Sequence, residues 1–257
     1  MIRGLIGSVF VVLVVTVGEA RAIDHGNLDE NRPARVEDAY PIAHGEIAVE
    51  GGAGFTLQRR GTNRGFFPME VLYGALPNLQ LSIGSVLSTD PREIEDRPKS
   101  GDVRLGALYN FNQETILLPA FALKLGLDIP TGVEARGYGV ELKGIVTKSI
   151  ERLSLHFNGG YEFLTDSRRD ERGGLYKLVL GASYPIGAPQ STRATLVLDV
   201  FTEQSVGRRD PEIIGTEIGL RYQLTPQIVG DVGIGSEFSG PSKRSPFFLA
   251  VGLSFSF

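Results

Sequence analysis

The last eleven residues of the chain alternate strictly between large apolar side chains and mostly small ones. Successive side chains of a β-strand point to opposite faces, so one face carries Phe247, Leu249, Val251, Leu253, Phe255 and Phe257. The other face carries Phe248, Ala250, Gly252, Ser254 and Ser256. A strand between lipid and a lumen of small residues explains this pattern well. A strand of a buried hydrophobic core is the alternative, and the rest of the chain distinguishes the two.

The first residues have the pattern of an export signal. A short basic start, Met1 to Arg3, precedes an almost uninterrupted apolar run from Leu5 to Val17. The sequence Ala20-Arg21-Ala22 is then a small-x-small cleavage site. We therefore expect a signal peptide over residues 1–22, removed after Ala22. The apolar run is shorter than the roughly 20 residues that a membrane helix needs, so a membrane-spanning form of this chain would be a closed barrel.

Composition excludes several classes of function. The chain has no cysteine, which removes disulfides and thiolate metal sites from consideration. The net charge is −4, so nothing in the composition indicates a nucleic-acid partner. There are 33 glycines, against about 18 expected from average usage. No linker divides the exported chain, and we expect one barrel domain over residues 46–257, preceded by a polar segment at residues 23–45.

Period-2 patterning predicts an all-β fold, a transmembrane up-and-down antiparallel barrel of about twelve strands. Short connections alternate with longer, charged ones along the chain, as expected for the two rims of such a barrel. An even number of strands places both termini on the short-turn, periplasmic side. The expected strands are 46–58, 68–76, 78–88, 101–112, 117–129, 138–148, 152–164, 174–185, 192–203, 213–223, 226–236 and 246–257.

Charged residues are sorted between the two faces of these strands. The apolar face carries a single charge, Lys148, at a strand end, and the opposite face carries Asp102 and the set given below. A lysine or arginine that faces lipid at the bilayer midplane costs roughly 2–4 kcal/mol, which explains the sorting. We therefore expect a polar lumen lined by Glu46, Glu50, Glu70, Arg104, Lys124, Asp128, Glu141, Lys143, His156, Glu162, Lys177, Arg193, Asp199, Glu217, Arg221 and Asp231.

Two motifs resemble a known family. The first is Arg32-Pro33-Ala34-Arg35-Val36-Glu37-Asp38-Ala39, followed by Gly45, Glu46 and Glu50; the second is Asp128-Ile129-Pro130-Thr131-Gly132, followed by Gly137 and Gly139. Together they resemble a family of bacterial outer-membrane transporters named for an association with the meta-cleavage pathway of phenol degradation. Val36 stands where that pattern has threonine. Over residues 32–257 the resemblance implies passage of small, aromatic or hydrophobic molecules.

Catalysis is the alternative class of function. His25 and His44 precede the barrel, and His156 is expected to face the lumen near Ser154. A barrel hydrolase acting on membrane lipid would need its nucleophile and base on the outer wall, and no Gly-x-Ser-x-Gly elbow is present. The histidine spacings do not indicate a metal site. We therefore expect no enzyme activity, no metal and no cofactor.

The lumen itself leaves two readings open. Eight-stranded barrels are filled by side chains, whereas barrels of sixteen to eighteen strands hold an aqueous channel. Twelve strands with a mixed-charge interior fit a narrow pore, or a non-conducting structural barrel with a salt-bridged interior. Residues 23–45 fit a periplasmic tail, the interpretation we favour from sequence, or a short plug. The expected partners are membrane lipid and a small-molecule solute; oligomeric state has no signal in the sequence.

Overall fold

The computed structural model describes residues 24–89, 100–242 and 244–257. The predicted signal peptide, residues 1–22, lies outside these ranges, as does most of the predicted loop at 89–100. Within the described ranges, no helix is long and apolar enough to cross a membrane.

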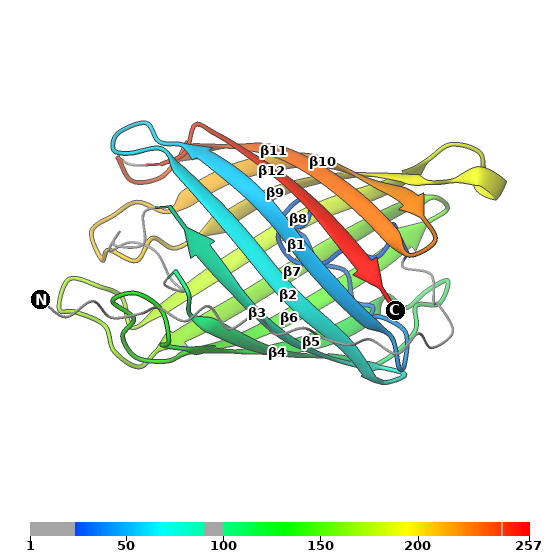
Figure 1. Ribbon diagram of the computed structural model, residues 1–257, viewed down its shortest axis with the longest axis horizontal. Coiled ribbons are helices and arrows are strands. Elements are labelled where there is room, and N and C mark those ends of the chain that lie inside the picture. The colour runs from blue at the N-terminus through cyan, green and yellow to red at the C-terminus, as the bar shows by residue number, and fades with distance from the viewer. Residues whose placement is uncertain (1–23, 90–99, 243) are drawn as a thin grey trace, which may run out of the picture.

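Twelve antiparallel strands close into one barrel, in which each strand pairs with the next and β12 pairs with β1 (Figure 1). The all-β barrel prediction is therefore confirmed. The strands are β1 Ile47–Leu57, β2 Arg64–Leu76, β3 Leu79–Ser88, β4 Val103–Asn110, β5 Ala120–Ile129, β6 Gly139–Ile150, β7 Leu153–Leu164, β8 Gly174–Ile186, β9 Ala194–Glu203, β10 Ile213–Thr225, β11 Ile228–Ser239 and β12 Phe247–Ser256. A 3-10 turn, Pro189–Ser191, lies between β8 and β9.

Three strand boundaries differ from the sequence prediction by three residues or more, one of them the end of β11, which lies at Ser239 and not at residue 236. Strand β2 begins at Arg64 because Arg64 pairs with Thr56 of β1, so the preceding loop is shorter than expected. Strand β5 begins at Ala120. The apolar residues Leu117 and Leu118, which we assigned to this strand, lie instead in the turn after β4. The apolar run Ile116 to Leu118 resembles the start of a strand, but it lacks the regular alternation of one.

The two ends of the barrel differ in their connections. At one end lie the β2–β3, β4–β5, β6–β7, β8–β9 and β10–β11 turns, together with the C-terminus on the right of Figure 1. Phe257 exchanges backbone hydrogen bonds with Ile47 at this end, so the start of β1 and the end of β12 share one rim. Most of the longer connections form the opposite end. The β4–β5 connection, residues 111–119, departs from the expected alternation because it is as long as the β5–β6 connection, residues 130–138. We call these the short-turn end and the long-loop end.

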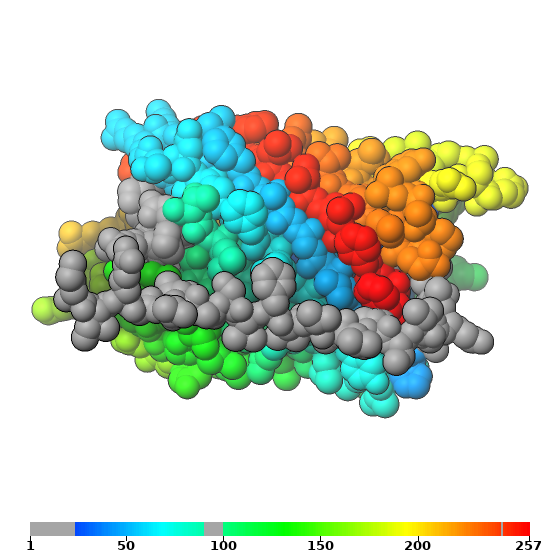
Figure 2. Space-filling model, viewed as in Figure 1, coloured from blue at the N-terminus to red at the C-terminus, as the bar shows by residue number. Residues whose placement is uncertain are grey.

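Side chains on neighbouring positions face opposite sides of the wall. Leu125 is 51% exposed while Lys124 beside it is 8% exposed, and Leu198 is 48% exposed while Asp199 is 1% exposed. Large apolar side chains are exposed along the outer face of every strand. Figure 2 shows part of this outer surface, where β1, β2 and β12 run side by side. The hydrophobic face therefore points outward, the reverse of a water-soluble barrel.

Residues 24–45 run inside the barrel, where Figure 1 shows the segment behind the front strands. Leu28, Val36 and Ala39 of this segment are at most 1% exposed. They pack against inward-facing residues of the wall, including Val179, Val197 and Ile145. The tail that we favoured from sequence is therefore wrong for these residues. The polar composition of this segment is as compatible with a charged lumen as with exposure to water, so composition alone could not distinguish the two positions.

Candidate functional site: the lumen and its N-terminal segment

The N-terminal segment, residues 24–45, enters and leaves the lumen at the short-turn end. His25 contacts Thr195 at 2.8 Å near the start of β9, and the segment returns to the same rim at β1. Between these points it forms a loop that is closed by two bonds between Leu28 and Asp38. The Asp38 amide donates to the Leu28 carbonyl at 3.1 Å, and the Leu28 amide donates to Asp38 Oδ2 at 2.8 Å. Residues 29–37 form the tip of this loop.

One side of the wall meets the tip with ammonium groups. The carboxylate of Glu30 contacts Lys143 at 2.6 Å, Lys177 at 3.1 Å and Lys124 at 3.4 Å. Glu37 contacts Lys124 at 2.8 Å and Lys143 at 2.6 Å. Burial raises the pKa of the Glu30 carboxyl, but the three ammonium groups together hold that pKa well below its usual value. Glu30 is therefore ionised at neutral pH. We call these lysines of β5, β6 and β8 the lysine side.

The other side of the wall meets the tip with carboxylates. Arg32 contacts Asp231 at 2.7 Å and Glu50 at 3.3 Å. Arg35 donates to Glu203 at 2.7 Å and to Glu217 at 2.9 Å, and Glu237 lies 3.7 Å away. The Arg35 guanidinium also lies over the ring of Phe201, 3.8 Å from its centre, an arrangement that favours arginine over lysine. We call this the carboxylate side, formed by Glu50, Glu203, Glu217, Asp231 and Glu237.

Glycines in the wall let the segment approach closely. A Cβ atom at Gly181 would lie 2.6 Å from a methyl group of Val36, which is closer than real contacts allow. A Cβ atom at Gly233 would overlap the carbonyl of Pro33. Side chains at these positions would push the tip away from β8 and β11. The high glycine content therefore has a local use in this lumen.

The return leg of the segment is held by uncharged side chains of the wall. The Glu37 amide donates to Asn158 Oδ1 at 2.7 Å, and Asn158 donates to the Glu37 carbonyl at 2.7 Å. The Ala39 amide donates to Thr147 Oγ1 at 3.0 Å. Further along, the Ile42 amide donates to Gln80 Oε1 at 2.9 Å. These bonds satisfy backbone groups that would otherwise be costly to bury.

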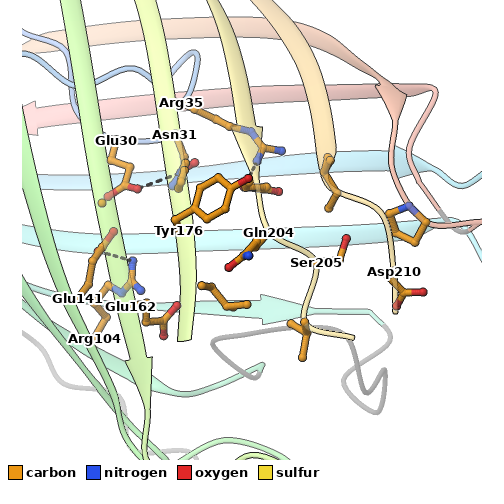
Figure 3. A pocket seen from close by; sticks show the side chains of 17 residues that line it. Glu30, Asn31, Arg35, Arg104, Glu141, Glu162, Tyr176, Gln204, Ser205 and Asp210 are labelled. Carbon is orange, nitrogen blue, oxygen red and sulfur yellow. Dashed lines mark hydrogen bonds and ion pairs between the residues drawn. The ribbon is translucent and has the colours of Figure 1, made fainter. Parts of the chain in front are cut away.

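Cavities lie on both sides of the tip. One of about 340 Å³ at the long-loop end is lined by Glu30, Arg35, Arg104, Glu141, Glu162 and Tyr176, among others (Figure 3). Another of about 360 Å³ lies at the short-turn end, beside Asp24, Tyr40 and His156. A third of about 240 Å³ has more apolar walls than the other two, with Phe66, Pro68 and Phe248 among its lining residues, but the charged residues Arg32, Arg35, Glu217, Asp231 and Glu237 line it as well. The tip of the segment thus separates the cavity at the long-loop end from the cavity at the short-turn end.

The predicted lumen-lining residues fall into three groups. Those in contact with the segment are Glu50, Lys124, Lys143, Lys177, Asp199, Glu217, Arg221 and Asp231, along with Glu46, which accepts from the Ala43 amide. Arg104 contacts Asp128 and Glu141 within the wall. Glu70, Glu162 and His156 lie on the same inward face.

Arg193 is the exception, because it is exposed in the turn before β9. The strand begins only at Ala194, so Arg193 lies beyond the rim and reaches water. Its assignment to the lumen is wrong. The sequence analysis also missed Glu203 and Glu237, which lie near strand ends, and Asn158 and Thr147, which carry no charge. Alternation along each strand predicts that these side chains face the lumen, but nothing in the sequence indicates which residues of the segment they contact.

His156 is 3% exposed and lies between two hydroxyl groups. Its Nδ1 lies 3.1 Å from Thr147 Oγ1, and its Nε2 lies 3.0 Å from Ser183 Oγ. The partner serine is therefore Ser183, not Ser154. A hydroxyl, in place of a carboxylate, occupies the position that would orient the base of a catalytic triad. The cluster faces the lumen, away from the outer wall.

The geometry described above is that of the outer-membrane β-barrel fold. The chain belongs to the family described as "Putative MetA-pathway of phenol degradation", whose model matches residues 31–256. This confirms the resemblance found in the sequence. No curated protein matches the chain in sequence.

Solved structures are similar in fold. The crystal structure of the COG4313 outer membrane channel from Pseudomonas putida F1 has 15% sequence identity and a TM-score of 0.64, covering 86% of this chain and 98% of that one. The NanC porin has 14% identity and a TM-score of 0.58, covering 81% of this chain and 98% of that one. The KdgM porin has 14% identity and a TM-score of 0.52, covering 82% and 99%.

The two motifs that carried the family resemblance have distinct structural roles. Residues 32–39 form much of the tip and its return leg inside the lumen. The Pro130-Thr131-Gly132 motif lies at the long-loop end, where the Gly132 amide donates to Asp102 at 2.9 Å and Thr131 Oγ1 accepts from the Val103 amide at 3.1 Å. This second motif joins the β5–β6 loop to the start of β4. Neither motif assembles catalytic groups.

Proposed function

We propose that this protein is an outer-membrane channel for passive passage of small molecules, and that the N-terminal segment closes its pathway. The observation that carries the proposal is the tip of the segment, held by ion pairs between cavities of about 340 and 360 Å³. A pore blocked only by a chain segment opens when that segment moves. The exposed apolar face of the wall supports a place in the membrane. We propose that the short-turn end faces the periplasm, as in outer-membrane barrels generally.

The third cavity supports passage of apolar or ring-containing solutes. At about 240 Å³, it is larger than the roughly 150 Å³ apolar cavity that is known to bind benzene in another protein. Phe66, Pro68 and Phe248 supply flat or rigid apolar walls within a lumen that is otherwise charged. A small aromatic or hydrophobic molecule would find apolar contacts there, beside the charged groups of Arg32, Arg35 and Glu217.

The test compares the exported protein with a variant that lacks residues 24–45. In planar bilayers and in liposomes, the deletion should raise single-channel conductance and the uptake rate of small solutes such as glycerol and phenol. The matched control is the full-length protein at equal insertion, checked by the faster migration of unboiled barrels on detergent gels. Liposomes that stay impermeable with the deletion variant would favour the alternative, a non-conducting structural barrel.

We propose that the protein has no enzyme activity. The environment of His156 supports this view, because Thr147 and Ser183 occupy both ring nitrogens inside the lumen. His156→Ala should leave lipid-hydrolysis assays at the background rate that the unaltered protein already gives. Hydrolysis that the unaltered protein performs and His156→Ala abolishes would establish the rival, a barrel hydrolase with His156 as its base.

A further inference from the structure

The turn between β4 and β5 presents apolar side chains at its tip. The Thr115 amide donates to the Leu118 carbonyl at 2.8 Å, and Thr115 Oγ1 accepts from the Leu118 amide at 3.0 Å. These bonds make Ile116 and Leu117 the two central residues of a tight turn. Asn112 supports the turn by donating to the Pro119 carbonyl at 2.8 Å and accepting from the Phe121 amide at 3.1 Å. The turn is therefore well ordered.

Ile116 is 94% exposed and Leu117 is 93% exposed, more than any other large apolar residue of the described chain. The central positions of tight turns normally carry glycine, asparagine, aspartate or proline, because those residues suit the backbone and prefer water. Two large aliphatic side chains at this place favour an apolar surrounding. Leu118, which is 50% exposed, extends the same surface toward the wall.

The turn is tied to the outer face of the barrel. Lys148, a charged residue on the apolar face of β6, donates from Nζ to the Thr115 carbonyl at 2.5 Å. Lys148 pairs with Leu155 of β7, and Leu155 is exposed on that face. Phe111, at the base of the turn, is 61% exposed and stacks edge-on against Tyr109 on the outer face of β4. The apolar tip is thus continuous with the exposed aromatic side chains of Phe111 and Tyr109 on the outer wall.

We propose that Ile116, Leu117 and Leu118 form an anchor that inserts into the interfacial region of the membrane leaflet at the short-turn end. Lys148 suits this place because its ammonium group can meet lipid phosphates while its stem lies along apolar surface. The continuity of the turn with the lipid-facing wall selects lipid as the occupant. This inference rests on the proposed membrane placement of the barrel and is independent of conduction.

The absence of tryptophan from the chain allows a clean test. The variant Leu117→Trp is reconstituted in phosphatidylcholine–phosphatidylglycerol vesicles, with bromine atoms placed at defined depths in the acyl chains. We expect blue-shifted emission, and strongest quenching by bromines near the headgroup end, because interfacial apolar groups lie roughly 5–10 Å into the headgroup–acyl boundary. Lys148→Gln should weaken this quenching by releasing the Thr115 carbonyl.

Two further variants serve as controls. Gln190→Trp places the indole in the exposed polar turn between β8 and β9 at the same rim, and should show water-like emission with weak quenching. Leu125→Trp reports the outer wall, and its failure to be quenched would reject membrane placement itself. If Leu125→Trp is quenched while Leu117→Trp resembles Gln190→Trp, the anchor is wrong and the exposed turn awaits a different partner, such as a protein.

Discussion

The lysine side and the carboxylate side of the lumen hold the same segment with opposite charges. On the lysine side, ammonium groups converge on Glu30 and Glu37. On the carboxylate side, acidic groups converge on Arg32 and Arg35. A half-turn of the segment about the barrel axis would bring like charges together on both sides. Charge complementarity therefore determines the orientation of the segment in the lumen, in addition to how tightly the segment is held.

The two sides also differ in chemistry. Lysine is a flexible point charge, so several lysines can share one carboxylate, as they do around Glu30. Arginine is a rigid fork that can address several acids at fixed positions, as Arg35 does while it lies over Phe201. On the carboxylate side, the effect of a substitution on how firmly the segment is held should therefore depend on the shape of the side chain as well as its charge. On the lysine side, the effect should depend mainly on charge and burial.

Departure of the segment can be measured with one reporter. The chain has no cysteine, and Ala34 at the tip is 2% exposed, so a cysteine in Ala34→Cys reacts with a maleimide chiefly when the segment leaves its site. The labelling rate then follows the population of the open state. The predictions below compare this rate between substitutions on the two sides.

Charge reversal at Glu30 should have the largest effect. Breaking a buried ion pair by removing one partner costs about 3–5 kcal/mol, and Glu30→Lys adds a fourth ammonium group to the lysine side. Because about 1.4 kcal/mol corresponds to a tenfold change, labelling should accelerate by more than about a hundredfold. The control Glu134→Lys reverses an exposed charge in the β5–β6 loop and should leave the rate unchanged. A slow rate in Glu30→Lys would show that the ion pairs do not hold the tip.

Neutralisation at Arg35 should have a smaller but still large effect. Arg35→Gln removes the contacts with Glu203 and Glu217 and the stacking on Phe201. Labelling should rise by about tenfold to a hundredfold, less than for a fully buried pair, because the side chains of Arg35 and Glu203 are 18% and 23% exposed. Arg35→Lys keeps the charge and loses the fork, so its rate should be intermediate. Equal rates for the two variants would mean that the shape of the guanidinium does not matter and would remove that difference between the sides.

The wall was predictable from the sequence because its pattern is local. Alternation along each strand decides which side chains face outward, as Leu125 and Leu198 do, without knowledge of any partner. The ends of the strands were harder to predict. Strand β9 begins one residue after Arg193, and this difference of one residue leaves Arg193 outside the lumen. Apolar residues at a turn, such as Leu117, imitate the start of a strand.

The segment was not predictable in the same way. Its contacts join residues far apart in the chain, such as Arg32 and Asp231, and no local periodicity indicates such pairs. The charged residues Glu30 and Glu37 suit water in isolation, and their burial is tolerable only because lysines surround them. A choice between tail and lumen therefore required the three-dimensional arrangement of the wall.

The smallest effect should come from the edge of the lysine side. Lys177 is 22% exposed in its side chain and, within the described part of the chain, forms an ion pair with Glu30 alone, whereas Lys143 is 4% exposed and contacts both Glu30 and Glu37. Partly exposed ion pairs contribute about 0.2–1 kcal/mol, so Lys177→Gln should raise labelling by no more than about fivefold. Lys143→Gln should exceed it clearly, because two buried carboxylates lose a partner. If the two variants label at the same rate, the burial of a lysine does not determine its contribution to holding the segment. The total charge around Glu30 would then alone determine how firmly the segment is held.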